Sequence, residues 1–559
     1  MAVCRCERPR TIPDVIDEKD ILVPTRDGGR VAVRVYRPSG PGRFPALFAA
    51  SPYRYDNDDM FTAMYRWRET GPISWYVEEQ GYAYVHADVV GTALSDGHYR
   101  FLDRAERRAH YDVVEWIAEQ PWSSGKIGGI GQSYYCMSQW LAAIERPPHL
   151  TCIAAYDGMI DPYSGAAFSN GIEKAWLPGW FNGSVRLANS WPANGARPRE
   201  LAHDIAYEAL QHPLYDDFWR ERSAIERIHE IDIPVFSIGV WAKQELHLAG
   251  NIVGYQRVSG PKKLFISGAA SGIACLLDFN EPSFHEEFLL PFYDRYLKGI
   301  PTSYDDRPQV EYAVRNTTER RSSPTWPPAD IQRIEFFLNS SPSRSLTSLN
   351  DGSLDAAEHA DGSTSYTYPD PQWTWGVATN EAPPDPVKRI LTFTTAPLDY
   401  DLELTGSAKL VLFASTTAHD MDFVVRISDQ SAQSDADRAA RRQPKATIVS
   451  KGWLRASHRQ KDARWSTDDV PVYSNTSLLP VEPGAIYELE VPLQAMAYRF
   501  RAGSRLRLEI ANHDSPQTDG QFMHYYKPSK IGTDTIYHDR RHRSRLIIPV
   551  LSNPSQDSL

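Results

Sequence analysis

The sequence predicts an α/β core with a mostly parallel sheet, followed by an all-β sandwich, and three observations support this prediction. Short apolar runs alternate with helical patterns up to about residue 300, which is typical of a parallel sheet with helices on both faces. Around Ser133, a glycine-rich strand runs directly into a helix-compatible stretch. From about Val310 onward, apolar and polar residues alternate in short runs separated by turn residues, which indicates a sandwich.

The strands of the parallel sheet follow from the apolar runs taken in order. Arg26-Asp27-Gly28-Gly29 predicts a hairpin turn between the first two runs, and residues 106–119 carry apolar side chains at helical spacing. A helix over residues 288–299 closes this part of the chain. The expected strands cover residues 20–24, 30–37, 46–51, 82–89, 152–156, 235–240 and 263–267.

A chain of 559 residues is too long for one hydrophobic core. Residues 17–157 and 232–300 are expected to form the two parts of the α/β core. Residues 158–231, rich in aromatic side chains and helical patterns, are expected to form a helical cap over the carboxyl edge of the sheet. The sandwich is expected over residues 310–555, with strands near 333–338, 390–394, 408–413, 422–427, 486–491 and 505–510.

Composition and charge indicate an ordinary globular protein with ample core. Hydrophobic residues make up 42% of the chain and aromatic residues 11%. The formal charge of -11 is spread along the chain without a basic run, which argues against a nucleic-acid or anionic-membrane partner. No apolar run reaches the roughly 18 residues that a membrane-spanning helix requires.

The cysteines do not have the spacing of zinc ligands. We interpret them as reduced thiols of a cytoplasmic protein, because the start of the chain lacks the apolar segment of a secretion signal. The sequence has no phosphate-binding glycine loop and no clustered metal ligands, so no cofactor and no metal are predicted. The five cysteines are Cys4, Cys6, Cys136, Cys152 and Cys275.

Ser133 is the first candidate for a catalytic side chain. A tight strand-to-helix turn, a nucleophile elbow, holds the hydroxyl above the sheet edge and directs the Tyr134 backbone N–H towards an oxyanion formed there. The pattern is G-x-S-x-Y instead of G-x-S-x-G, and a G-x-S is also common as an ordinary turn before a helix. Cys136, three residues later, is interpreted as a small core residue and not as a nucleophile.

Several short sequence runs, spread from about residue 17 to residue 550, carry a family resemblance. They are Ser51-Pro52-Tyr53, Asp88-Val89-Val90-Gly91-Thr92 with Ser95-Asp96-Gly97, residues 116–122, the elbow, residues 212–219, Leu297-Lys298-Gly299 and residues 452–459. With these runs the chain resembles the CocE/NonD family, which comprises proteins similar to cocaine esterase, α-amino-acid ester hydrolase and Xaa-Pro dipeptidyl-peptidase. The resemblance implies an α/β-hydrolase core, an inserted helical cap and a C-terminal jelly-roll domain.

The resemblance also implies a role for Tyr53. It corresponds to the family's phenolic oxyanion-hole donor, paired with the Tyr134 backbone N–H. A phenol can donate a charge-assisted hydrogen bond to a developing alkoxide, and loss of such a donor costs about 3 kcal/mol.

Two positions depart from the family pattern. Lys243 stands where the family has the carboxylate of its catalytic triad, and Ser271 stands where the family has the catalytic histidine. No histidine lies between residues 248 and 284. Moving the match to the family pattern by a few residues within that loop therefore brings no histidine to the position of the base. Both partners of Ser133 are therefore expected to be missing, and a serine without a base is a poor nucleophile.

Three alternatives follow from these departures. His247 or His285 could act as a relocated base, or each could be an ordinary histidine. Lys243 could be a neutral base, could hold an anionic substrate, or could be a solvated lysine without a role. In the third alternative the oxyanion hole serves another reaction, such as cyclisation, elimination or isomerisation.

Aromatic residues of the cap are candidates for the wall of a substrate pocket, and the alternative is that they form the cap's own packing. They are Trp176, Trp180 and Phe181, together with Trp241 after the penultimate core strand.

The sequence therefore favours an enzyme of specialised metabolism that acts on a small, largely apolar carbonyl compound by non-hydrolytic chemistry. A serine ester, thioester or amide hydrolase that uses Ser133 with a relocated base is the first alternative. A catalytically silent binding protein is the second. The expected partner is a small-molecule substrate, and a homodimer is possible.

Overall fold

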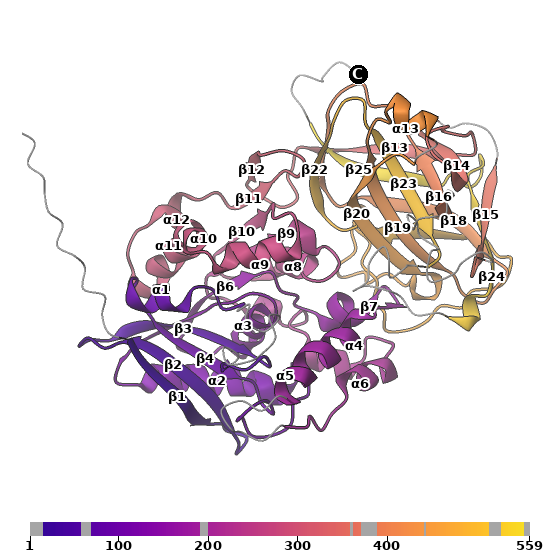
Figure 1. Ribbon diagram of the computed structural model, residues 1–559. Helices are drawn as coiled ribbons and strands as arrows, with labels where there is room; N and C mark the ends of the chain where they lie inside the picture. The colour runs from indigo at the N-terminus through magenta and orange to yellow at the C-terminus, as the bar shows by residue number, and fades with distance from the viewer. Residues whose placement is uncertain are drawn as a thin grey trace, which may run out of the picture.

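The computed structural model describes residues 15–56, 69–190, 199–357, 362–370, 388–440, 443–513 and 527–552. Its first body is built on a ten-stranded sheet with the order β1-β2-β4-β3-β5-β6-β9-β10-β11-β12 (Figure 1). The strands from β4 to β11 in this order run parallel, as the alternation of apolar runs and helices predicted. These strands are β1 (Val15–Pro24), β2 (Arg30–Pro38), β3 (Phe44–Ser51), β4 (Ala83–Asp88), β5 (Ser123–Gly129), β6 (Leu150–Tyr156), β9 (Val235–Val240), β10 (Lys262–Ser267), β11 (Val310–Ala313) and β12 (Arg320–Ser323).

Helices cover both faces of this sheet. On one face lie α2 (Arg104–Glu119), α3 (Tyr134–Glu145) and α8 (Leu248–Arg257), while α1 (Ile73–Glu78) and the helical turns between His285 and Lys298 lie on the other. Asp103, the residue before helix α2, caps the helix, because its side chain accepts a hydrogen bond from the Glu106 N–H. None of the described helices is long and apolar enough to cross a membrane.

The insertion between β6 and β9 is helical, as expected, but its helices are short. The expected run over 166–188 is interrupted near Gly171, where β7 and β8 form, and then continues as helix through Pro178 from residue 176 to residue 190. The expected run over 198–228 is interrupted at Pro213, because proline ends regular helices. Residues 191–198 lie outside the described part of the chain. The elements of the insertion are β7 (Phe168–Ser169), β8 (Ile172–Glu173), α4 (Trp176–Trp180), α5 (Leu187–Ser190), α6 (Ile205–Gln211) and α7 (Asp217–Arg222).

The second body is all-β, and each of the six predicted sandwich strands overlaps a strand of its 13-stranded sheet. The inward side chains, among them Leu410, Leu412 and Leu508, form a fully buried core. The strands are β13 (Ile331–Asn339), β14 (Ser348–Asp355), β15 (Ser363–Tyr368), β16 (Lys388–Thr394), β17 (Leu402–Gly406), β18 (Lys409–Thr416), β19 (Asp422–Gln430), β20 (Ala446–Arg455), β21 (Tyr487–Pro492), β22 (Met496–Phe500), β23 (Arg505–Ala511), β24 (Gly532–Tyr537) and β25 (Arg545–Leu551).

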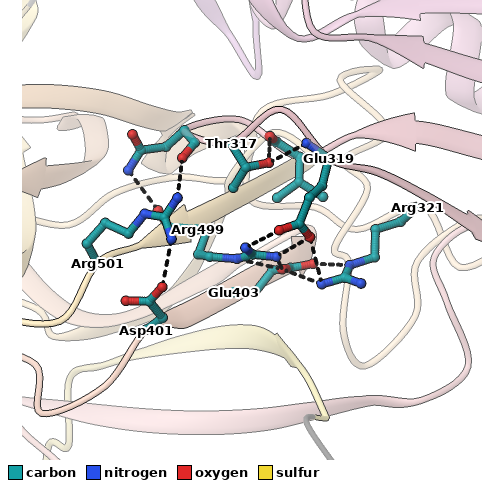
Figure 2. Close-up of polar contacts among 9 residues, drawn as sticks. Thr317, Glu319, Arg321, Asp401, Glu403, Arg499 and Arg501 are labelled. Atoms are coloured by element: carbon teal, nitrogen blue, oxygen red, sulfur yellow. Dashed lines mark hydrogen bonds and ion pairs between the residues drawn. The ribbon is translucent and has the colours of Figure 1, made fainter.

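The β11–β12 hairpin joins the two bodies, and here the expected boundary at residue 310 is wrong. Strand β11 pairs in parallel with β10, so the first sheet continues beyond that residue. The turn of the hairpin is bound to the second body by ion pairs (Figure 2). Arg499 of β22 binds Glu319 through two contacts of 2.6 and 2.7 Å, and it binds Glu403 of β17 at 2.7 Å. Arg321 of β12 binds the same Glu403 at 2.9 Å.

Candidate active site

Ser133 occupies a strained turn between β5 and α3, the geometry expected of a nucleophile elbow. Its backbone angles are φ 61° and ψ -117°, which a residue with a side chain adopts only at some cost. The Ser133 N–H donates to the carbonyl of Asp157 at 2.9 Å, which holds the turn against the end of β6. Gly131 has a φ of +123°, and a Cβ at this position would lie 2.4 Å from the Tyr135 Cβ. The local sequence therefore specifies this turn.

Two hydrogen-bond donors lie at the elbow. The Tyr134 N–H lies at the start of α3 and has no hydrogen-bond acceptor within the described part of the chain. The Tyr53 ring contacts the rings of Tyr134 and Tyr135 at centroid distances of 6.0 and 6.2 Å. The Tyr53 phenol oxygen accepts a hydrogen bond of 2.8 Å from the indole N–H of Trp180, so the phenol can donate its own proton elsewhere.

Glu69, which the sequence analysis did not identify, lies next to Ser133. Its backbone carbonyl accepts a hydrogen bond of 2.7 Å from the Gln132 N–H, which places Glu69 beside the elbow. The buried Oε2 of its carboxyl group has no hydrogen-bond partner among the described residues. Burial of the carboxyl raises the pKa of Glu69 to about 8, although the Lys243 ammonium opposes this rise. No sequence motif surrounds Glu69, so only the folded chain could reveal this neighbour.

Lys243 and Ser271, the two residues expected to replace triad members, have different environments. Lys243 lies near the carboxyl groups of Asp157 and Glu69 and is not a solvated surface residue. Burial is the largest single influence and lowers the pKa of Lys243, but Asp157 and the other negative groups around it together raise this pKa above its ordinary value, which argues against a neutral lysine base. Ser271 caps helix α9 (Gly272–Asn280), because its hydroxyl accepts a hydrogen bond of 3.1 Å from the Ala274 N–H.

His247 forms a buried pair with Asp157 but not with Ser133. Its Nδ1 lies 3.1 Å from Asp157 Oδ1, without the alignment of a hydrogen bond, and neither residue is more than 1% exposed. Neither ring nitrogen has a hydrogen-bond partner among the described residues. Burial lowers the pKa of His247 below its ordinary value. Asp157 also accepts a hydrogen bond of 2.9 Å from the Gln132 side chain.

His285, the other histidine considered as a relocated base, is a core residue. Its Nε2 lies 2.6 Å from the Phe279 carbonyl and its Nδ1 lies 2.9 Å from the Tyr76 hydroxyl, so both ring nitrogens are occupied. Burial lowers the pKa of His285 to about 4. The hypothesis that His285 serves as the base is therefore wrong, because a saturated and buried ring cannot accept a proton from Ser133.

The four aromatic residues assigned to a pocket divide into two pairs. The indoles of Trp176 and Trp180 stack at 5.4 Å, both are partly exposed, and Trp180 contacts Tyr53. Phe181 and Trp241 are at most 1% exposed, so they cannot line an open pocket. Trp241 instead packs in the core near the second body and donates a hydrogen bond of 2.7 Å to the Ala313 carbonyl.

The described cysteines are buried and free. Burial raises the pKa of the Cys136 thiol well above its ordinary value, which agrees with a core residue and not with a nucleophile. Cys4 and Cys6 lie outside the described residues.

The strand order, with a strained serine turn after β5, defines the class of protein as an α/β-hydrolase with an appended all-β domain. A family model of the X-Pro dipeptidyl-peptidase (S15 family) matches residues 27–270. A second model, of the X-Pro dipeptidyl-peptidase C-terminal non-catalytic domain, matches residues 302–547. The chain belongs to the CocE/NonD family, which confirms the resemblance seen in its sequence.

Similar proteins are found in both sequence and structure. The cocaine esterase of a Rhodococcus species is 24% identical over 95% of this chain and 98% of its own. A CocE/NonD family hydrolase from Staphylococcus aureus has a TM-score of 0.80 and 24% identity, covering 96% of this chain and 94% of that one. An α-amino acid ester hydrolase has a TM-score of 0.73 and 19% identity, and the match covers 97% of this chain and 98% of that one.

These relationships identify the chain as an enzyme of the serine esterase and peptidase type within the α/β-hydrolase superfamily. They do not support the expected non-hydrolytic chemistry, and serine hydrolysis fits them better. The cytoplasmic location, the role in specialised metabolism and the homodimer stay predictions.

Proposed function

We propose that this protein is a serine acyl hydrolase that cleaves esters, thioesters or amides of small, largely apolar acids through an acylated Ser133. The observation that carries the proposal is the strained turn of Ser133, beside which the Glu69 backbone is held by a hydrogen bond of 2.7 Å from the Gln132 N–H and the Glu69 carboxyl group has a buried oxygen without a hydrogen-bond partner among the described residues. In this proposal Glu69 is the relocated base, in place of the histidine that the family has at the position of Ser271. The partly exposed indoles of Trp176 and Trp180 would provide the apolar surface for the substrate.

The reaction follows from these positions. The Glu69 carboxylate accepts the Ser133 proton while the serine oxygen attacks the carbonyl carbon of the substrate. The Tyr134 N–H and the Tyr53 hydroxyl donate hydrogen bonds to the oxyanion that forms. Protonated Glu69 then donates its proton to the leaving group, and a water molecule, deprotonated by the same carboxylate, releases the acid from Ser133.

The pKa values of the three candidate bases predict different pH profiles. Glu69 accepts a proton only when it is ionised, so the rate should rise with pH and level off above about 8. If His247 were the base, the rise would be complete near neutral pH, because its pKa lies below 6.5. A lysine base would place the rise above pH 10.5.

A fluorophosphonate probe tests the proposal without knowledge of the substrate. We expect the probe to label Ser133, the Ser133→Ala variant to remain unlabelled, and the labelling rate to rise with a midpoint near pH 8. Glu69→Gln should lower the labelling rate at pH 8 by at least about 100-fold, within the range for loss of a general base, while His247→Gln serves as the matched comparison. An unlabelled wild-type protein, or a Glu69→Gln variant that is labelled at the wild-type rate, would contradict the proposal.

A further inference from the structure

The β7–β8 hairpin of the insertion lies against the second body. At its turn, the Asn170 carbonyl accepts a hydrogen bond of 3.0 Å from the Arg455 N–H, and the Asn170 side-chain amide donates one of 2.9 Å to the Trp453 carbonyl of β20. A Cβ at Gly171 would lie 2.2 Å from His458 Cδ2, so the turn approaches the second body too closely for a side chain. The hairpin is therefore fixed to the end of β20.

Glu173, the last residue of β8, is a buried charge that the second body neutralises. Its carboxylate forms an ion pair of 3.2 Å with Arg455 and a second one with the Lys527 ammonium, and its side chain is only 8% exposed. Both cations belong to the second body. A buried carboxylate is stable only with such partners, so the end of β8 is held where these two cations lie.

Lys174, the next residue, binds the first body. Its ammonium group donates hydrogen bonds to the carbonyls of Ser164 at 3.0 Å and Gly165 at 2.9 Å, both in the insertion. It donates a third, of 2.7 Å, to the carbonyl of Glu245, which follows the turn after β9 in the core. Glu173 and Lys174 together thus fix the end of β8 between the second body and the core.

Helix α4 begins two residues after Lys174 and carries Trp180 at its end. The Trp180 indole N–H donates a hydrogen bond of 2.8 Å to the Tyr53 hydroxyl, and the indole stacks on the Tyr134 ring at a centroid distance of 6.0 Å. Trp180 therefore contacts both residues that supply donors to the proposed oxyanion hole. Because α4 follows directly after the fixed end of β8, that end sets the point from which the helix starts.

We infer that Glu173 is a positioning residue for the reaction: its ion pairs with the second body fix the start of α4, and so the Trp180 hydrogen bond that orients the Tyr53 hydroxyl. This inference rests on the proposed function. The second body matches a family model described as a non-catalytic domain. It contributes to the oxyanion hole in this way although it supplies none of the donors.

The rate of fluorophosphonate labelling at Ser133 tests this inference, because an oxygen of the probe takes the place of the oxyanion. Glu173→Gln retains the size of the side chain but removes both ion pairs. The maximal labelling rate should fall about fivefold or more, which is part of the roughly 10²–10³ that loss of a whole donor costs. The probe concentration that gives half of this rate should change little. Glu403→Gln, which removes the ion pairs with Arg321 and Arg499 at the β11–β12 hairpin, is the matched control and should leave the rate unchanged.

A double-mutant cycle separates positioning from a general loss of stability. In the Tyr53→Phe background, Glu173→Gln should change the labelling rate by less than about twofold, because the donor on which it acts is already absent. Asn170→Gly is a milder variant that removes the hydrogen bond to the Trp453 carbonyl, and glycine tolerates the φ of 46° at this position. It should lower the rate in the same direction by a smaller factor.

The thermal unfolding midpoint shows whether each variant is folded. If folded Glu173→Gln is labelled at the wild-type rate, or lowers the rate by the same factor with and without the Tyr53 hydroxyl, the inference is wrong although Ser133 keeps its proposed role. If Glu173→Gln does not fold, the same two outcomes are judged on Asn170→Gly. If the wild-type protein is not labelled at all, the proposed function itself fails.

Discussion

At the scale of single residues, Tyr53 depends on the cap as well as on the core. It follows β3 in the core, yet its hydroxyl oxygen accepts a hydrogen bond from Trp180 of α4 in the insertion. This bond directs one lone pair of the phenol towards the indole, so the direction in which the hydroxyl proton can point is restricted. The cap therefore helps to orient a donor of the candidate oxyanion hole.

Tyr53→Phe should lower kcat for ester hydrolysis by about 10²–10³, which corresponds to roughly 3–4 kcal/mol of lost transition-state stabilisation. KM should change little, because the lost hydrogen bond forms mainly to the oxyanion. Steady-state kinetics with an activated aryl ester measures both constants. Trp180→Phe retains an aromatic ring but not the hydrogen bond, and its effect on kcat should be smaller. A Tyr53→Phe variant with unchanged kcat would show that the phenol does not contact the oxyanion.

At the scale of elements, the β5–α3 turn depends on glycines that leave space for neighbouring atoms. A Cβ at Gly131 would collide with Tyr135, and a Cβ at Gly158 would lie 2.5 Å from the Cys136 Cβ and 2.9 Å from the Ser133 carbonyl oxygen. The end of β6 and the start of α3 can approach this closely only because these side chains are absent. The position of Ser133 is thus set by backbone packing.

Gly131→Ala should destabilise the protein by at least about 2 kcal/mol and abolish labelling of Ser133, because the positive φ and the contact with Tyr135 both disfavour a side chain. Chemical denaturation and probe labelling measure the two effects. Gly179→Ala in α4 is the matched control, since nothing lies within 4 Å of the added Cβ, and it should be as stable as the wild type or more so. Equal stability and labelling in both variants would contradict a strained elbow.

At the scale of the whole molecule, buried ion pairs connect the two bodies. Arg455 of β20 binds Asp422 of β19 at 2.8 Å and Glu173 of β8 in the insertion at 3.2 Å. These side chains are at most 10% exposed, and each has a second charged partner, because Asp422 also pairs with Lys530 at 2.7 Å and Glu173 also pairs with Lys527. The ion pairs of Arg499, shown in Figure 2, connect the β11–β12 hairpin to the second body.

Arg499→Ala should destabilise the protein by about 1–3 kcal/mol, because Glu403, only 9% exposed, then retains Arg321 as its ion-pair partner while Glu319 loses its two close contacts. Arg501→Ala removes an exposed pair with Asp401 and should change stability by less than about 0.5 kcal/mol. Denaturant titration of both variants measures the difference. If the two substitutions had equal effects, the Arg499 network would not hold the hairpin to the second body.

The pattern of apolar residues predicted most of the core strands, because each strand is encoded by a short run of its own residues. Strands β4 and β9 are buried along their whole length, as parallel strands covered on both faces must be, and they are apolar except for His86 and Asp88 in β4 and Ser237 in β9. The cap was predicted less well, since its helical patterns include glycine and proline residues whose effect depends on the surrounding packing. Aromatic character alone could not separate Trp176 and Trp180, which are partly exposed, from Phe181 and Trp241, which are buried.

The sequence by itself determined the order of strands and helices, the serine turn and the family, because these follow from short-range periodicity and local runs of residues. Only the tertiary structure decided which groups surround the Ser133 hydroxyl. Glu69 and Lys243 are distant from Ser133 in the chain; the Glu69 carbonyl accepts a hydrogen bond from the Gln132 N–H, and the Lys243 side chain packs against Gly272. No local pattern encodes such contacts, because they depend on how the loops at the sheet edge pack together.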